Sequence, residues 1–204
     1  KKLIDAGKIG KILNIRAHYG HGGRPGMESE WRCSKELCGG GELLDQGVHL
    51  IDLCRWLTDL EVLEVSGKVA TSFWDIEVED NAYFNLFFEN NTIAQCHVSW
   101  TNWRNSFVFE IFGYDGYIKI SGLGGSYGTE TLECGIRNPK GGKPAVKITE
   151  YSVGDNSWLL EWKDFKSAIQ NRVEPLGNGY DGLMANMIVE KIYHSSSSNS
   201  VVSL

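Results

Sequence analysis

A succession of short runs in which apolar and polar residues alternate constrains the fold of this chain more than any other feature. Alternation with a period of two predicts β-strands. The runs are separated by turn residues such as Asn90-Asn91 and Asp115-Gly116, which tolerate positive φ and are typical of tight hairpins. The predicted strands cover residues 8–19, 61–73, 81–88, 92–100, 106–112, 117–121, 131–135 and 146–151. Consecutive hairpins predict a large, mostly antiparallel sheet.

Three other segments repeat apolar residues at helical spacing, namely 42–57, 158–171 and 181–194. The serine run at 195–198 is expected to end the last helix before a short strand at 201–202, and the apolar stripe of 158–169 predicts a helix face in the core. This order predicts one α+β domain, residues 1–204, with an open sheet and helices on one face. Apolar residues on both faces of several strands predict a second subunit on the other face, in a homodimer or homotetramer.

The charge balance and the cysteine count exclude several partners. The net charge of -6 argues against nucleic acid, because phosphate binding needs clustered Lys and Arg. No apolar run approaches the roughly 18 to 20 residues that cross a bilayer, so no membrane partner is expected. The five cysteines form no C-x-x-C pair, which predicts reduced thiols in a cytoplasmic protein. The chain starts in mid-element, which suggests a piece of a longer protein.

The segment GGGELLDQGVHLIDLCRW, residues 39–56, predicts an active-site helix. Asp45 and His49 are four residues apart and share one helical face. A carboxylate beside an imidazole orients the ring and favours its protonated form, which makes a proton-handling pair. The alternative is a core histidine satisfied by Asp45 or Asp52. The glycine triplet that opens the helix allows either a close approach to a ligand or a turn with positive φ.

With its flanks, this segment resembles the Gfo/Idh/MocA family of NAD(P)-dependent oxidoreductases. The start KKLIDAGKIGKIL resembles the family's entry to its second domain, FEIFGYDG at 109–116 with 117–120 resembles its strand–turn–strand, and 162–175 with 181–194 resembles its closing helices. The resemblance implies the carboxy-terminal domain alone. The family's amino-terminal Rossmann domain, with its G-x-G-x-x-G loop and catalytic Lys, is absent from this sequence. The glycine-rich stretch at 122–128 lies between predicted strands and opens no helix, so it is not expected to hold phosphate.

The resemblance also implies an activity. The longer protein would oxidise a hydroxyl of a sugar, sugar nucleotide or polyol, or run the reverse reaction, with NAD or NADP as cofactor. His49, assisted by Asp45, would take the hydroxyl proton as the hydride leaves. The chain by itself is expected to bind no cofactor and to be catalytically inactive.

Substrate-binding candidates come from the long loop at 20–41 and from its surroundings. Trp31 and Arg32 could stack on and hydrogen-bond a sugar, although Trp31 could instead hold the loop to the core. Arg24 could pair with an acidic or phosphorylated group of a sugar nucleotide. The family places substrate contacts near the positions of Trp103 and Arg104.

His18 and His21 precede the long loop and could join Asp45 and His49 as metal ligands. No Glu or Cys stands at ligand spacing to complete such a set, so no metal is expected, and His18 is interpreted as a substrate contact.

Two other functions stay open at this stage. The domain could be a non-catalytic dimerising or ligand-binding module with a structural Asp-His pair, or a metal-dependent hydrolase or isomerase.

Overall fold

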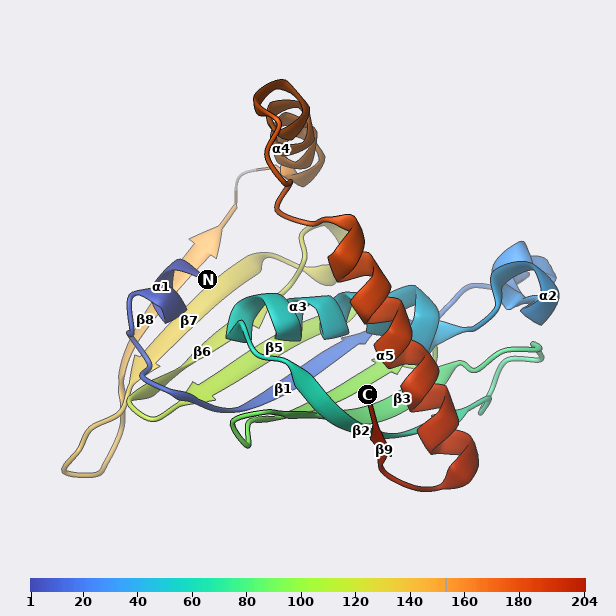
Figure 1. The fold of residues 1–204 in the computed structure, drawn as a ribbon, viewed down its shortest axis with the longest axis horizontal. Helices are drawn as coiled ribbons and strands as arrows, with labels where there is room; N and C mark the ends of the chain where they lie inside the picture. The colour runs from blue at the N-terminus through green and yellow to red at the C-terminus, as the bar shows by residue number, and fades with distance from the viewer. Residues whose placement is uncertain (153) are drawn as a thin grey trace.

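A computed structural model describes residues 1–152 and 154–204, and its centre is one nine-stranded sheet with the strand order β8-β7-β6-β5-β1-β4-β3-β2-β9 (Figure 1). Neighbouring strands are antiparallel except for β1 and β4, which pair in parallel. The strands are β1 Ile12–Gly20, β2 Val62–Ala70, β3 Asn81–Phe88, β4 Ile93–Ser99, β5 Ser106–Gly113, β6 Gly116–Ser121, β7 Glu130–Ile136, β8 Ala145–Tyr151 and β9 Val202–Ser203. The predicted α+β fold with a mostly antiparallel open sheet is confirmed.

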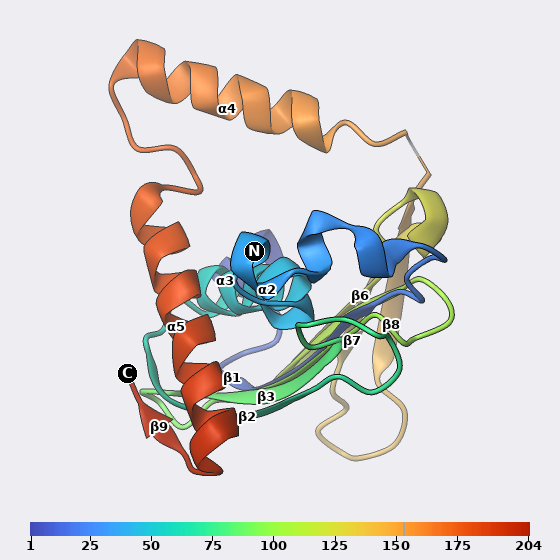
Figure 2. The same ribbon diagram turned by 90° about the vertical axis from the view of Figure 1, so that its right-hand side faces the viewer.

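The helices that pack on the sheet cover one of its faces (Figure 2). Short helical segments come first: α1 Lys2–Asp5, 3-10 turns at Met27–Ser29 and Trp31–Cys33, and α2 Lys35–Cys38. A π-helical segment, Leu43–Gly47, leads into α3 Val48–Thr58, and the chain later forms α4 Ser157–Asn171 and α5 Gly179–Ser198.

Helix α3 packs one apolar face against the strands, and the buried residues of that face are Leu50, Ile51, Cys54 and Leu57. Alternate residues of the strands, such as Phe84 on β3, meet them from the sheet, and this layer forms the main core. No helix formed by residues 1–152 and 154–204 packs on the opposite face of the sheet (Figure 2).

The serine run does not end the last helix, contrary to the prediction, because α5 continues through Ser198. Strand β9 pairs with β2 only at Glu64 and Val65. Beyond that point the hydroxyls of Ser195 and Ser196 accept hydrogen bonds from the β2 N–H groups of Gly67 and Val69, each at 3.0 Å. The serines therefore take the place of a strand partner at the edge of the sheet.

The prediction that residues 158–169 face the core is wrong. Helix α4 stands away from the sheet (Figure 2), and Ala168 is its one buried residue. Trp158 is 80% exposed, Trp162 63% and Ile169 63%. Spacing along a helix identifies an apolar face, but it does not say whether the partner of that face lies within the same stretch of chain.

Candidate active site at the loop edge of the sheet

Four loops meet at one edge of the sheet, where β1, β2, β4 and β6 end. They cover residues 21–42, 71–80, 100–105 and 122–129. Backbone hydrogen bonds connect them: the N–H of Asn102 donates to the carbonyl of His21 at 3.1 Å, and that of Glu42 donates to the carbonyl of Glu79 at 3.0 Å. The beginning of the 39–56 motif lies within this loop edge.

The glycine triplet owes its composition to neighbouring protein atoms and to one turn. Gly39 has φ of 82° and ends α2 in a left-handed conformation. A side chain at Gly40 would overlap the Tyr193 hydroxyl, and one at Gly41 would overlap the carbonyl oxygen of Glu79. The positive-φ interpretation therefore holds at Gly39, while at the next two glycines the close approach is to α5 and to the loop at 71–80.

Glu79 caps the motif helix. Its Oε1 accepts hydrogen bonds from the N–H groups of Gly41 and Leu43, both at 3.0 Å, and from the Tyr193 hydroxyl at 2.7 Å. A carboxylate at the amino end of a helix satisfies N–H groups that have no partner within the helix and complements its dipole. Glu79, only 7% exposed, thus fixes where the motif begins.

Asp45 lies in the π-helical segment and His49 in the first turn of α3. The His49 side chain is exposed and that of Asp45 is half-buried, so both are open to the loop edge. No hydrogen bond joins the two side chains in the described part of the chain. A single π turn inside a helix is a frequent feature of functional sites, and here it contains Asp45.

Tyr19, which the sequence analysis did not single out, lies beside His49, and Tyr127 packs against Tyr19. The Tyr19 ring lies 6.5 Å from the His49 ring and packs edge-on against Tyr127 at 5.4 Å. Burial raises the pKa of both phenols. Strand alternation places Tyr19 opposite to His18, on the helix-covered face, and this signal was available in the sequence. Tyr127 belongs to the glycine-rich stretch at 122–128, which connects β6 to β7.

Glu42 is a further acidic group beneath the motif. Its side chain is 0% exposed, and neither carboxylate oxygen has a hydrogen-bond partner among the described residues. Burial raises the pKa of Glu42 well above its ordinary value, and the nearby Asp45 carboxylate adds to this effect. Both effects favour the neutral, protonated form of the Glu42 carboxyl group.

Histidine 21 belongs to the same edge. Burial lowers the pKa of His21, and the positive charges of Arg24 and Arg32 lower it further. The negative charge of Asp45 acts in the opposite direction and partly offsets the effect of burial. The structure therefore brings His21 into the neighbourhood of Asp45.

The predicted substrate contacts of the loops are all exposed at or near this edge. Arg24 is engaged by Glu30 in an ion pair of 2.7 Å. Trp31 is 59% exposed, and the Arg32 guanidinium lies 5.4 Å from its ring, so neither side chain is packed into the core. Trp103 and Arg104 are exposed in the loop between β4 and β5.

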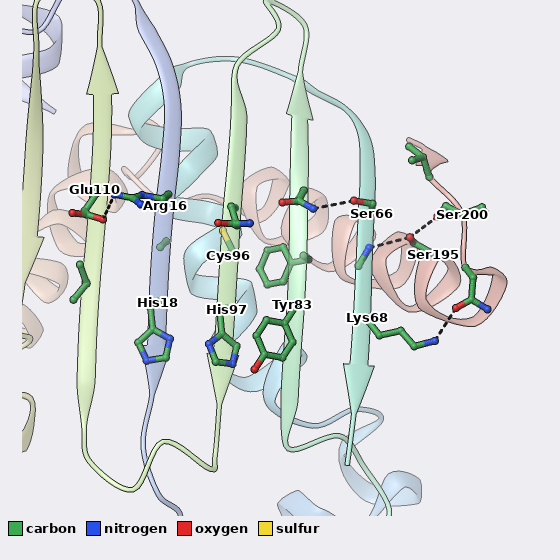
Figure 3. Close-up of a pocket in the computed structure, with 18 residues that line it drawn as sticks. Arg16, His18, Ser66, Lys68, Tyr83, Cys96, His97, Glu110, Ser195 and Ser200 are labelled. Atoms are coloured by element: carbon green, nitrogen blue, oxygen red, sulfur yellow. Dashed lines mark hydrogen bonds and ion pairs between the residues drawn. The ribbon is translucent and has the colours of Figure 1, made fainter. Parts of the chain in front are cut away.

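His18 does not join this group. It lies on the opposite, uncovered face of the sheet, where Figure 3 shows it in a row with His97 and Tyr83. The His18 and His97 rings are 4.9 Å apart, and His97 stacks on Tyr83 at 4.0 Å. His18 therefore lies apart from Asp45 and His49, because successive strand residues point to opposite faces and the helix lies on the other one. Its role as a substrate contact stays a prediction.

The uncovered face is hollowed over its central strands, with a volume of about 730 Å³. Arg16 and Glu110 form an ion pair of 3.3 Å at one side of the hollow, and Lys68 reaches the Asn199 side chain at the other. Burial, and then the neighbouring His18, lowers the pKa of His97 to about 4.

Among residues 1–152 and 154–204, no helix combines the length and apolar character that a bilayer crossing requires. In the same part of the chain, His, Cys, Asp and Glu side chains do not gather in a group of three that could hold a metal ion.

Fold and loop edge together define an α+β domain that presents an exposed imidazole and a half-buried carboxylate at one end of an open sheet. The family model for the GFO/IDH/MocA C-terminal domain matches residues 1–119, more than half of the chain. The chain therefore belongs to the GFO/IDH/MocA family and represents its C-terminal domain.

Relatives agree with this assignment. The D-xylose 1-dehydrogenase (NADP(+)) of Haloarcula marismortui is 26% identical over 100% of this chain and 56% of its own length. The levoglucosan dehydrogenase of Pseudarthrobacter phenanthrenivorans is 24% identical over 99% of this chain and 62% of its own length. The structure of the aldose-aldose oxidoreductase from Caulobacter crescentus superposes with a TM-score of 0.84 at 26% identity, covering 100% of this chain and 58% of that one. The chain thus spans little more than half the length of these relatives.

Proposed function

We propose that this chain forms the substrate-binding and oligomerisation part of an oxidoreductase that uses NAD or NADP and acts on a hydroxyl of a sugar, sugar nucleotide or polyol. The observation that carries the proposal is the exposed His49 imidazole, one helical turn from the half-buried Asp45, at the loop edge of a GFO/IDH/MocA domain. The names of the relatives support the substrate class, since they act on D-xylose, levoglucosan and aldoses.

In this proposal His49 handles the proton. A ring nitrogen of His49 accepts the hydroxyl proton as the carbon loses its hydride, and returns it in the reverse reaction. Asp45 stabilises the imidazolium that forms, through its negative charge on the same helix face. The Tyr19 ring lies beside the imidazole on the sheet side, and Tyr127 packs against Tyr19. When bound, a nicotinamide dinucleotide supplies the hydride acceptor.

The described residues do not fit the dinucleotide itself. Its pyrophosphate is typically held where a strand passes through a glycine loop into a helix. The glycine-rich stretch 122–128 instead connects two antiparallel strands through a 3-10 turn. We therefore assign the dinucleotide to an amino-terminal Rossmann domain of the longer protein, and expect this chain alone to be inactive. The exposed apolar stripe of α4 supports the assignment to a separate domain, because such a domain could cover it.

The uncovered sheet face is the proposed contact between subunits. Tyr83 is 55% exposed there and Ile93 44%, and no helix of the described chain packs on this face. A second copy would cover these side chains and give the homodimer or homotetramer. Because this face is opposite to the helix-covered face, where α3 carries His49, assembly would leave the entrance to His49 open.

The decisive experiment compares two histidines in the longer protein. We expect His49→Gln to lower turnover by about 10²- to 10⁴-fold, the range of general acid–base catalysis, with nearly unchanged dinucleotide affinity. His194→Gln, a matched substitution at an exposed position of α5, should retain turnover. Nicotinamide absorbance follows the reaction over a panel of sugars and sugar nucleotides. If His49→Gln kept the turnover of the unaltered protein across neutral pH, the assignment would be refuted and a non-catalytic module favoured.

A further inference from the structure

Two aromatic rings from different loops stand together in solvent at the loop edge. Phe73 and Trp103 are each 62% exposed, and their ring centroids are 4.7 Å apart in an edge-to-face arrangement. Rings of this size are normally buried, and an exposed pair that is held in one geometry is typical of a binding site.

The loop that carries Phe73 is fixed by one buried acid. Asp80 is 0% exposed, and its carboxylate accepts the N–H groups of Ser72 and Phe73, both at 2.8 Å, and of Trp74 at 3.1 Å. The Trp74 indole N–H in turn donates to the carbonyl of Trp100 at 2.9 Å, which ties this loop to the one that carries Trp103. The Phe73 ring is therefore presented by a rigid support.

Trp103 is held in a backbone conformation that bulky residues avoid. Its φ is 51°, in the left-handed region. The Asn102 side chain bridges across it to the carbonyl of Arg104 at 2.9 Å, and Gly22 packs against its Cα so closely that a side chain there would crowd it. Strain of this kind persists only where the surroundings impose it, and it is frequent at ligand sites.

This pair adjoins the proposed active site through the end of β1. Gly22, which contacts Trp103, directly follows His21 in the chain. The negative charge of Asp45 acts on the pKa of His21. The backbone of Asn102 is bonded to that of His21 as well. These contacts lead from the neighbourhood of Asp45 through His21 and Gly22 to Trp103.

We propose that Phe73 and Trp103 form a carbohydrate-binding subsite that receives a second sugar ring of the substrate, so that the preferred substrate is a glycoside or short oligosaccharide. The inference rests on the proposed function, which places the reacting ring at Asp45 and His49. An aromatic face suits the C–H face of a pyranose, and the exposed Arg104 beside it offers N–H donors to ring hydroxyls. A monosaccharide would leave both rings uncovered.

Calorimetry and saturation-transfer NMR on the longer protein test this subsite with two sugar series. One series is glucose, cellobiose and cellotriose, and the other is glucose, maltose and maltotriose. We expect affinity to rise at least tenfold from the monosaccharide to the di- or trisaccharide of one series. Trp103→Gly should abolish that gain while melting no lower than the unaltered chain, because glycine adopts the left-handed conformation without strain. Phe73→Ala should reduce the gain, and Tyr114→Ala, an equally exposed aromatic residue on a distant turn, should preserve it.

The outcomes separate this subsite from the proposed function. If no sugar longer than glucose binds more tightly in either series, or if the gain survives in a Phe73→Ala/Trp103→Gly double variant, the subsite is refuted. Self-association that these substitutions abolish, with no sugar effect, refutes it in favour of a protein contact. If the gain appears but His49→Gln leaves turnover of the longer protein unchanged, the subsite stands and the catalytic assignment fails.

Discussion

The Tyr193 hydroxyl donates a 2.7 Å hydrogen bond to the Glu79 oxygen that also caps the motif helix. Tyr193 belongs to α5, near the end of the chain, and Glu79 lies just before β3. The two residues thus connect the C-terminal helix to the start of the proposed catalytic segment. Burial raises the pKa of Tyr193, and the adjacent Glu79 carboxylate strengthens this effect, so the phenol stays a donor.

The close packing around this cap predicts unequal costs for alanine within the glycine triplet. Gly41→Ala should lower the free energy of unfolding by about 2–3 kcal/mol, because the added methyl overlaps the Glu79 backbone. Gly39→Ala has open space around it and should cost about 1 kcal/mol, from its positive φ alone. Urea unfolding measures both. Equal costs at the two positions would contradict the packing argument.

The buried Glu42 predicts a pH-dependent stability. In the unfolded chain Glu42 ionises near its ordinary pKa of 4.5, whereas in the folded chain the raised pKa keeps it protonated. The free energy of unfolding should therefore fall as the pH rises above 4.5, by up to about 1.4 kcal/mol per pH unit, until the pH passes the raised pKa.

Glu42→Gln removes this ionisation and should become progressively more stable than the unaltered chain above pH 4.5. The exposed Glu64→Gln serves as the control, with a stability curve that stays parallel to that of the unaltered chain. Chemical denaturation between pH 4 and 8 checks the difference, and parallel curves for Glu42→Gln would show that the carboxyl ionises normally.

The uncovered sheet face predicts self-association. Tyr83→Asp places a charge at the centre of that face and should raise the dissociation constant of the assembly at least tenfold, because an unpaired charge is costly to bury. Tyr114→Asp, on a turn outside the hollow, should leave assembly unchanged. Sedimentation equilibrium at micromolar concentration distinguishes the two. A chain that is monomeric before any substitution would rule out this contact.

Much of the fold was predictable because local rules decide it. The strand prediction at 81–88 coincides with β3, and the motif helix begins within one residue of its predicted start. The errors occur where a distant partner decides. The apolar face of α4 meets no partner among the described residues, and the serines of α5 stay helical because β2 supplies donors to their hydroxyls.

The candidate site was predictable only in part. The spacing of Asp45 and His49 indicated their common helix, whereas Glu79 and Tyr127 reach the site through tertiary packing that leaves no periodic signal. The parallel pairing of β1 with β4 is likewise a long-range arrangement. Alternation along β1 would have separated His18 from Tyr19, since it assigns them to opposite faces.

Helix α4 provides the last prediction. In the 204-residue chain its amides should exchange with solvent at least about 100-fold faster than those of α3, because α3 buries four apolar residues and α4 buries only Ala168. Trp158 and Trp162 should show the red-shifted emission of solvated indoles. In the longer protein, a domain covering the apolar stripe should slow exchange in α4 to near that of α3. Hydrogen exchange with mass spectrometry compares the two proteins, and rapid exchange of α4 in both would mean that its apolar face stays uncovered.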